Sequence, residues 1–153
     1  MSRRTDPVVR RATLEDAPVI ARFNQAMARE TEGKELDAEV LAAGVRAVFD
    51  DPNRGFYLVA ESDECVAGCL MITYEWSDWR NGMFWWIQSV YVHPDFRREG
   101  IYRTLYAEAR AMGRKAGAIG FRLYVETENS RAQQTYAALG MERCAYAMFE
   151  ELL

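Results

Sequence analysis

The sequence predicts an α/β protein whose central, mostly antiparallel mixed sheet is covered by helices on both faces. Three observations lead to this fold class: helical apolar periodicity in two separate regions, three consecutive strand-like runs divided by turn residues, and an alternation of strand and helix from residue 83 onward. With 153 residues, half of them hydrophobic, the chain is long enough to bury a substantial core. We expect one domain over residues 1–153.

Composition excludes several classes of function. A net charge of −4 argues against a nucleic-acid partner held by a positive field. The longest apolar run, residues 83–87, is too short to cross a bilayer, and the arginine-containing N-terminus has no apolar segment of a secretory signal. We therefore expect a cytoplasmic protein that contacts neither nucleic acid nor membrane.

The cysteines predict neither a disulfide framework nor a metal site. Cys65, Cys69 and Cys144 are odd in number and form no Cys-x-x-Cys pair, so no zinc site and no other metal are expected. We interpret them as small core residues in a reducing compartment.

The N-terminal third predicts a short strand and two helices. Val8 and Val9 begin the strand, and Thr13 followed by Asp16 resembles a capping box at the start of the first helix. A second helix is expected over residues 37–49, capped by Asp37. Its apolar positions are expected to share one side; they are Val40, Leu41, Val45 and Val48.

Three strands should follow as an antiparallel meander. Residues 55–61 and 66–76 are separated by a polar turn, and Asn81-Gly82 supplies residues that tolerate positive φ before the third run, residues 83–92. This third run is apolar on both alternating faces. We therefore expect it to be a central strand covered on both sides.

The remaining elements alternate. A helix of about four turns should begin at Ile101, with Gly113 and Gly117 near its end. Residues 120–127 are predicted to form another strand, residues 129–140 a capped helix stopped by glycine, and residues 143–152 a final strand.

The junction within residues 90–110 has the features of an anion site. His93-Pro94 ends the strand, because proline cannot donate to the ladder. The next helix begins with N–H groups that lack intrahelical partners, and the helix dipole favours an anion such as a diphosphate there. Gly100 allows a close backbone approach, and Arg97 and Arg98 add charge. Taken alone, this stretch fits an ordinary strand-to-helix turn equally well.

A second motif lies downstream. Asn129, Ala132, Tyr136 and Gly140 form Asn-x-x-Ala-x-x-x-Tyr-x-x-x-Gly, in which Asn129 caps a helix and Ala132 and Tyr136 share its face. The two motifs at this separation resemble the GNAT superfamily of acyl-CoA-dependent N-acetyltransferases. The resemblance covers nearly the whole chain in its order of elements and is specific over residues 90–140. It implies a GNAT-like fold and acetyl-CoA (CoA) as the cofactor.

The resemblance implies roles for individual residues. The family strand that matches Val90, Tyr91 and Val92 pairs through its backbone with the pantetheine arm. The asparagine that matches Asn129 contacts the pantetheine or a bound water, and the tyrosine that matches Tyr136 lies beside the thioester sulfur. The loop that wraps the diphosphate matches Arg97, Arg98, Glu99, Gly100, Ile101 and Tyr102. Tyr102 is a departure, because the family has a small residue there, and its side chain is expected to point away from the anion.

The implied reaction needs a neutral amine and a proton for the leaving thiolate. Free alkylamines have a pKa of about 10.4, so the enzyme must select or make the minor neutral form. Tyr136, with a reference pKa of about 10, is the predicted donor to the sulfur, and core packing is its alternative role. The backbone N–H of Val92 or of a neighbour is a candidate to polarise the thioester carbonyl.

The general base is not evident in the sequence. Residues 73–79 bear a fainter likeness to spermidine/spermine N-acetyltransferases, in which a glutamate occupies the position that matches Gln88. An amide cannot take a proton at neutral pH. The remaining candidates are Glu75, Glu126 and Glu128, each of which is otherwise a solvated charge, whereas His93 suits turn structure better.

Carboxylates and aromatic rings together predict an acceptor that carries an amine. The candidate substrate residues are Glu30, Glu32, Glu75, Trp76, Gln88 and Glu126. Such a set can hold an ammonium group by ion pairing and cation–π attraction, or it can be a polar loop with aromatics at a dimer interface. The expected partner is a small-molecule amine, with a homodimer as a further possibility. An acyl-CoA-binding sensor or scaffold without transferase activity is the alternative function.

Overall fold

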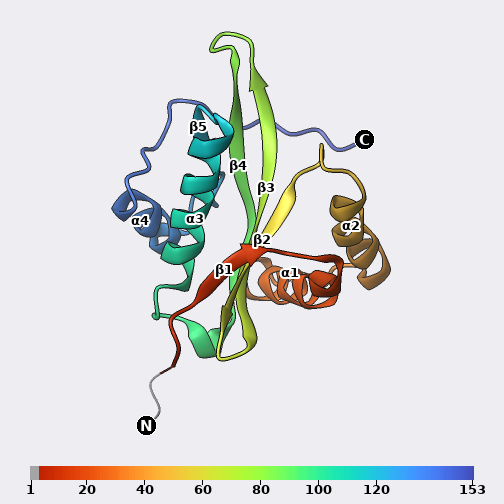
Figure 1. Ribbon diagram of the computed structural model, residues 1–153. Coiled ribbons are helices and arrows are strands. Elements are labelled where there is room, and N and C mark those ends of the chain that lie inside the picture. Colours follow the sequence, from red (N-terminus) through yellow and green to blue (C-terminus); the bar gives the residue numbers. More distant parts are fainter. Residues whose placement is uncertain (1–3) are drawn as a thin grey trace. The chain divides into compact units, whose positions relative to one another are not determined.

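The computed structural model describes residues 4–153, which divide into two compact units, one up to Leu123 and one over Tyr124–Leu153. The first unit contains a five-stranded sheet in the order β1-β2-β3-β4-β5 (Figure 1). Its strands are β1 (Val8–Arg11), β2 (Phe56–Ser62), β3 (Cys65–Ser77), β4 (Gly82–Val92) and β5 (Gly120–Arg122). Neighbouring strands are antiparallel except for the parallel pair of β4 and β5. The predicted mixed sheet is confirmed.

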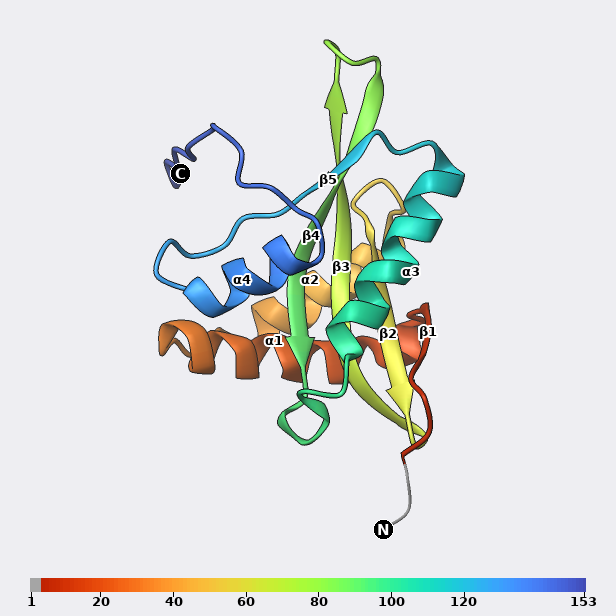
Figure 2. The ribbon, with the colours of Figure 1, turned by 90° about the vertical axis from the view of Figure 1, so that its left-hand side faces the viewer.

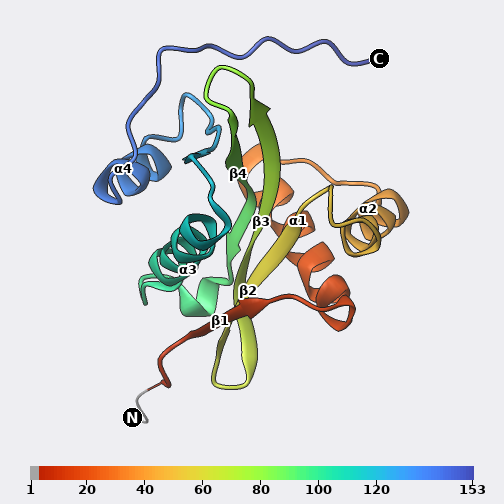
Figure 3. The ribbon, with the colours of Figure 1, turned by 45° about the horizontal axis from the view of Figure 1, so that its top comes forward.

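Helices cover both faces of this sheet, as predicted. The helices α1 (Ala17–Glu32) and α2 (Ala38–Asp50) lie on one face, and α3 (Ile101–Ala116) lies on the other (Figures 1 and 3). Two short 3₁₀ turns, η1 (Leu14–Asp16) and η2 (Pro94–Phe96), precede α1 and follow β4. The hairpin of β3 and β4 extends beyond the helices (Figure 2). None of the helices in the described range is both long and apolar enough to cross a membrane.

The predicted caps form. The Asp37 carboxylate accepts hydrogen bonds from the backbone N–H groups of Glu39 and Val40, which fixes the start of α2. Before α1, Asp16 accepts from the backbone N–H of Thr13 at 2.7 Å, as a capping box requires.

Each face of the sheet has its own buried core. Toward α3, the side chains of Leu70, Ile72 and Leu105 are fully buried. Toward α1 and α2, Ile20 packs in a cluster with Val59 and Cys69. Burying one such aliphatic side chain stabilises the fold by about 1.5–3 kcal/mol, so these two layers hold the sheet in place.

Two predictions are wrong: that Val40 shares the packed side of α2, and that all three cysteines are core residues. Val40 is 71% exposed, and Val45 is the residue that α2 buries. Val40 lies in the first turn of α2, where the helix is only beginning to pack against its neighbours. Cys65 is exposed because it opens β3 at a turn, and Cys144 of the second unit is exposed as well, so Cys69 is the buried cysteine.

The hairpin turns depend on left-handed backbone. Asp63 and Glu64 both have positive φ, which suits the tight connection between β2 and β3. In the next turn Asn81 has a φ of 48°, as predicted, but Gly82 already belongs to β4. A Cβ on Gly82 would lie 2.4 Å from the Ile119 side chain, so close packing explains this glycine.

β5 is shorter than predicted. It pairs with β4 only from Phe84 opposite Gly120 to Trp86 opposite Arg122, whereas the sequence predicts a strand over residues 120–127. Three residues beyond Trp86, Ser89 has a φ of 50° inside a β-bulge. A bulge bends its strand and disrupts the ladder, so the pairing of β5 ends before it.

The second unit contains one regular element, α4 (Ser130–Ala138). Asn129 accepts from the backbone N–H of Ala132, and Gly140 follows the helix with a φ of 93°, so the predicted caps are present. The predicted strand over residues 143–152 is wrong: no part of residues 141–153 forms a strand. An apolar sequence forms a strand only where its backbone pairs with a neighbour, and the pattern of residues alone cannot supply that partner.

Candidate active site

The junction of β4 and α3 forms the centre of the candidate site in the first unit. Gly100 has a φ of 78° and is the N-cap of α3, but it offers no side chain to the first turn. Open space surrounds it, since a Cβ there would have no neighbour within 4 Å. The N–H groups of Ile101 and Arg103 are therefore not capped by a side chain and can face an anion.

β4 leaves part of one edge open beside this junction. β5 pairs with β4 only as far as Trp86, so among residues 4–153 no strand continues along that edge past Trp86. Backbone groups on such an edge are available to a ligand that pairs as a strand would. These features fit a cofactor with an amide-containing arm and a diphosphate. The resemblance assigns that arm to Val90–Val92.

A bulge lies at the same place. Two residues, Ser89 and Val90, stand opposite Leu70 alone, and regular pairing resumes at Tyr91 opposite Cys69. As a result, Gln88 and Tyr91 both face α1, although they are three residues apart. This bulge could not be predicted from the sequence, because Ser89 is not a residue type that favours positive φ.

Arg97 belongs to a cluster that joins β4 to α1. Its Nη2 donates to Glu30 Oε2 at 2.7 Å, and its Nε donates to the carbonyl oxygen of Val92 at 3.0 Å. The Tyr91 hydroxyl donates to the other oxygen of Glu30 at 2.9 Å. Burial opposes ionisation of Glu30, but the bonds from Arg97 and Tyr91 outweigh it and hold its pKa below the ordinary value. Glu30 therefore orients Arg97 and Tyr91 and has no free carboxylate oxygen for an ammonium group.

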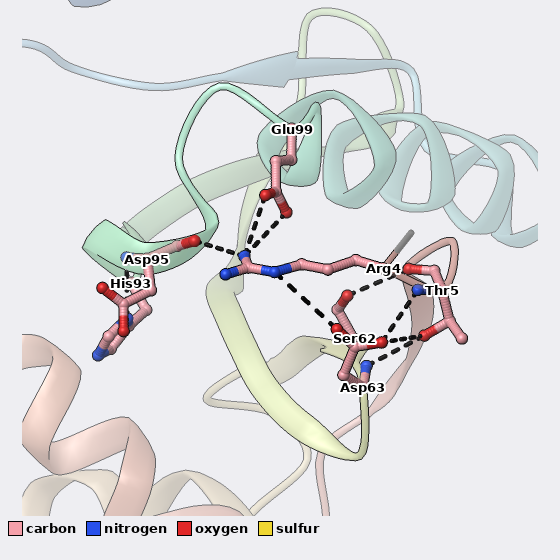
Figure 4. A network of polar contacts seen from close by, with 7 residues as sticks. All are labelled: Arg4, Thr5, Ser62, Asp63, His93, Asp95 and Glu99. Atoms are coloured by element: carbon pink, nitrogen blue, oxygen red, sulfur yellow. Dashed lines mark hydrogen bonds and ion pairs between the residues drawn. The ribbon is translucent and has the colours of Figure 1, made fainter. Parts of the chain in front are cut away.

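A second ionic network holds the loop before α3 from the other side. Arg4 donates to Glu99 at 3.0 and 3.2 Å and to the carbonyl oxygen of Asp95, and its guanidinium lies 4.4 Å from the centre of the Phe96 ring. It also pairs with Asp63 in the β2–β3 turn (Figure 4). Arg4 thus neutralises the one carboxylate inside the predicted diphosphate loop, a contact between residues 95 apart in the sequence.

Three further residues of this junction have structural roles. His93 accepts from the backbone N–H of Asp95 through Nδ1, so it caps η2, which confirms its predicted role in the turn. Tyr102 stacks on Tyr106 along α3, with ring centres 6.2 Å apart. Its ring therefore lies along the helix, which fits the expectation that it points away from the anion. Arg98 has a φ of 66°, a left-handed conformation that sharpens the turn.

A polar patch occupies the α1-facing side of the β3–β4 hairpin. Trp86 Nε1 and Arg122 Nη1 both donate to Glu75 Oε1, at 2.8 and 2.9 Å. These two bonds, that from Trp86 first, lower the pKa of Glu75, so its carboxylate is ionised at neutral pH and is a weak general base. Beside it, Gln88 Nε2 donates to Thr73 Oγ1 at 2.7 Å.

Two other predicted substrate residues of the first unit, Trp76 and Glu32, form no hydrogen bond or ion pair with this patch among the described residues. Trp76 is 57% exposed and points to the opposite face from Glu75, because neighbouring residues of a strand alternate. Glu32 lies at the exposed end of α1 beside Lys34. Glu126 is exposed in the second unit, where its carbonyl oxygen accepts from Gln133. Arg122 is the residue that sequence reasoning missed, since only the short β5 reveals its neighbours.

The second unit holds the other predicted motif. Asn129 uses its side-chain oxygen to cap α4, and Tyr136 lies on that helix. Burial raises the pKa of the Tyr136 phenol, so it stays protonated through the neutral range and can donate a proton. Residues 4–153 contain no cluster of three or more His, Cys, Asp or Glu side chains that could hold a metal ion.

Comparison with known families decides the assignment. The profile described as "Acetyltransferase (GNAT) family" matches residues 20–141, which include the strands β2 to β5 and the helices α2, α3 and α4. The chain belongs to the GNAT family. The cofactor of this acetyltransferase family is acetyl-CoA, so the predicted family, enzyme class and cofactor are confirmed at family level.

Solved GNAT structures share the fold. A possible acetyltransferase from Clostridium difficile 630 is 46% identical, with a TM-score of 0.90, and the match covers 96% of this chain and 97% of that one. A predicted acetyltransferase from Clostridium acetobutylicum, solved with acetyl-CoA, is 14% identical with a TM-score of 0.78, over 95% and 96% of the two chains. This second likeness concerns the fold alone.

One relative in sequence is named for its activity. Thialysine N-epsilon-acetyltransferase from Bos taurus is 30% identical over 78 residues. The match covers 51% of this chain and 45% of the relative, so it spans about half of either protein.

Proposed function

We propose that this protein transfers an acetyl group from acetyl-CoA to a primary amine of a small molecule or peptide, by direct attack in a ternary complex. The observation that carries the proposal is the start of α3 behind Gly100, which no side chain caps, next to the open edge of β4 in a GNAT fold. The bovine relative's name, which describes transfer to an amine nitrogen, supports the acceptor class.

The residues proposed to hold the cofactor follow from this arrangement. The N–H groups at the start of α3 and the side chain of Arg98 would bind the diphosphate, and the backbone of Val90–Val92 would pair with the pantetheine arm, with Asn129 as a further contact. When bound, acetyl-CoA supplies an activated thioester. Glu30 keeps Arg97 anchored to the end of β4, so the loop is already shaped before binding.

The roles proposed for this chain are proton transfer and orientation of the reacting groups. Tyr136 is proposed to protonate the departing thiolate, because its phenol remains neutral at the pH of the reaction. A backbone N–H at the Ser89–Val90 bulge, or that of Val92, is proposed to polarise the thioester carbonyl. Gln88 cannot act as a base, so the amine's proton would leave through water or through Glu126 or Glu128.

The partners also remain proposals. The acceptor is proposed to be a small-molecule amine, which fits the acidic net charge of −4. A homodimer is a further proposal. Its candidate surface is the exposed aromatic side chains of Trp76 and Trp79 on the hairpin, which are 57% and 87% accessible.

Titration of the protein with acetyl-CoA and CoA in a calorimeter tests the cofactor part of this proposal. Thiol-release assays over polyamines, amino acids, aminoglycosides and peptide N-termini test the acceptor part. Tight binding with turnover of one amine class is the expected result, whereas the absence of acetyl-CoA binding would contradict the proposal. Binding without turnover across the panel would favour a sensor of acyl-CoA, the function for which Gln88 in place of a glutamate is the best support.

The variant Tyr136→Phe separates an enzyme from a sensor. We expect turnover to fall by about 10²–10⁴-fold, the usual contribution of a general acid, while the Kd for acetyl-CoA changes little. Tyr124→Phe removes a hydroxyl from the same unit as a matched control. Unchanged turnover in Tyr136→Phe would show that another group protonates the thiolate.

A further inference from the structure

A surface cavity of about 410 Å³ lies in the first unit, on the face of the sheet that α3 covers. We call it the aromatic cavity. Three aromatic rings of the sheet and two cationic side chains line it, namely Phe56, Tyr74, Trp85, Arg11 and Lys115. Small-molecule sites commonly enclose roughly 300–1,000 Å³, so this cavity is large enough for a small ligand.

The register of the sheet brings the three rings together. Tyr74 stands opposite Trp85, and Phe56 stands opposite Ile72, two residues before Tyr74. Neighbouring residues of a strand alternate between the two faces, so Glu75 lies on the other side of the sheet. The aromatic cavity is therefore separate from the polar patch of the hairpin.

The rings form an apolar floor. Phe56 and Trp85 are 8% and 7% exposed, and their rings meet edge to face with centres 5.4 Å apart. The Tyr74 ring meets Trp85 in the same way at 5.9 Å. Aromatic rings prefer such contacts, so a further flat ring can pack on this floor by the same geometry.

The polar groups around the floor are donors that lack partners. The Arg11 guanidinium lies 4.2 Å from the centre of the Phe56 ring, but it makes no hydrogen bond or ion pair with any residue of the range 4–153. Lys115 also pairs with no described carboxylate, and the indole N–H of Trp85 donates to no described residue. These three groups can only donate, and none of the described residues that line the cavity is acidic. The surroundings therefore favour an anion.

Tyr74 adds a hydroxyl to these donors. Burial raises the pKa of Tyr74, and the positive charge of Arg11 opposes this rise. The hydroxyl is thus protonated at neutral pH and can donate. Because Arg11 acts on it electrostatically, the two groups are close enough for one anion to contact both.

The end of α3 limits the charge of that anion. Lys115 and Ala116 line the cavity and are the last two residues of the helix. A helix C-terminus carries a partial negative charge, which repels a doubly charged phosphate more than a singly charged carboxylate. A planar carboxylate also matches the fork of an arginine.

The aromatic cavity is distant from the predicted diphosphate loop. Met112, which also lines it, follows Gly100 by 12 residues of α3, or about 18 Å along the helix axis. A small ligand in the cavity would therefore not reach the N–H groups at the start of α3.

We propose that the aromatic cavity is a second binding site, whose ligand is a small aromatic carboxylate. Arg11 and Lys115 hold the carboxylate, and the rings of Phe56, Tyr74 and Trp85 pack against the ring of the ligand. The proposal does not depend on acetyl transfer.

Four probes test the ligand class: benzoate, indole-3-acetate, indole-3-acetamide and acetate. Titration of the full chain, followed by ligand-observed NMR, gives each Kd. We expect at least one aromatic carboxylate to bind, and indole-3-acetate to bind about tenfold more tightly than its amide, because the amide forfeits charge-assisted hydrogen bonds. Acetate, which has no ring, should bind more weakly than either aromatic acid.

Variants identify the site. Arg11→Gln should raise the Kd for indole-3-acetate by about tenfold, and Lys115→Gln by about threefold, because its flexible ammonium is more solvated. Neither change should alter the Kd for indole-3-acetamide. Arg114→Gln is the matched control, since Arg114 is an exposed cation in the same turn that does not line the cavity. The Tm of each variant should stay close to that of the wild type.

Three results would overturn the proposal. The first is no binding of either aromatic acid up to about 5 mM, and the second is an unchanged Kd in Arg11→Gln. The third is displacement of the bound acid by saturating CoA, which would place the acid in the cofactor site. Each of these results would leave the proposed acetyl transfer standing, because that reaction is tested with acetyl-CoA and amines.

Discussion

Arg4 lies far from the predicted diphosphate loop in the sequence but contacts it directly. It binds Glu99 within the predicted diphosphate loop, and it holds Asp95 and Asp63 as well (Figure 4). An unpaired carboxylate in that loop would repel a diphosphate. We therefore expect Arg4 to support cofactor binding from outside the motif.

Replacing Arg4 tests this role. Arg4→Gln should raise the Kd for acetyl-CoA by about fivefold, a modest effect because the pair is 40% exposed on both sides and solvent screens it. Calorimetry measures the change. The double variant Arg4→Gln with Glu99→Gln should recover most of the affinity, since the repelling charge is gone. The exposed Arg54, which donates to the carbonyl oxygen of Ala47, provides a control as Arg54→Gln.

The cysteines should differ in reactivity. Burial raises the pKa of Cys69 to about 12, so its thiolate is scarce at pH 8, whereas Cys65 and Cys144 are exposed. A chromogenic thiol reagent should count two thiols in the folded protein and three after denaturation. Rapid reaction of three thiols in the folded state would contradict the described core. Thiol-release assays therefore need the Cys65→Ser, Cys144→Ser background.

At the scale of elements, the helix α3 and the strand β5 are in close contact at Gly113. The sequence predicts Gly113 and Gly117 near the end of the helix, and α3 does end at Ala116, followed by Gly117 with a φ of 80°. A Cβ on Gly113 would lie 2.5 Å from the Phe121 ring. This glycine allows the close approach of helix and strand.

Gly113→Ala should therefore destabilise the protein despite its better helix propensity. The propensity gain is about 1 kcal/mol, whereas overpacking costs about 1–3 kcal/mol, so we expect a net loss of up to about 2 kcal/mol. Urea unfolding monitored by circular dichroism measures it. Adding Phe121→Leu should relieve the clash in part, and Gly44→Ala, on α2 with open space around its Cβ, should be neutral or stabilising. A stabilising Gly113→Ala would refute the tight contact.

Most elements could be predicted because their signals are local. These signals depend only on neighbours in the sequence. They are the caps at Asp37 and Asn129, the apolar periodicity in α3 and the turn at Asn81. The failures depend on pairing between distant segments. The length of β5 and the absent strand after residue 142 were set by partners that no local pattern reveals.

The candidate site divides in the same way. Gly100 and Asn129 are recognisable because one position needs a bare backbone and the other needs a cap. The contacts of Glu30 with Arg97 and of Glu75 with Arg122 join residues 67 and 47 apart, and each shows that a carboxylate predicted to bind substrate is already paired with an arginine. Residue type alone could not distinguish a free carboxylate from a paired one.

At the scale of the whole first unit, Asp16 joins three segments. It accepts two bonds from Arg10 of β1, at 2.7 and 2.9 Å, and caps the turn before α1, while Arg10 also binds Glu61 of β2. The bonds from Arg10 are the largest cause that lowers the pKa of Asp16 below its ordinary value. Asp16 is 7% exposed, so solvent screens its carboxylate little, whereas Arg10 and Glu61 are 35% and 40% exposed.

Acid should therefore weaken the fold through Asp16. Because its pKa is lower in the folded state, its contribution is present above the unfolded value of about 3.9 and is lost as pH falls through the folded value. Asp16→Asn should cost about 1–3 kcal/mol at pH 7. The difference from wild type in urea unfolding should shrink below about pH 4. Asp6→Asn, at an exposed carboxylate, is the control, and a difference independent of pH would contradict this account.

The bulge in β4 has a consequence for any change in chain length. From Phe84 to Gln88 the even-numbered residues face α1, and from Tyr91 the odd-numbered ones do, so the extra residue at Ser89–Val90 reverses the parity of the strand. Deleting one of these two residues would restore simple alternation. It would leave Tyr91 opposite Cys69 on the face toward α1, so the bond from Tyr91 to Glu30 should be retained. The bulge thus holds the one residue that β4 can lose without exchanging side chains between its two faces.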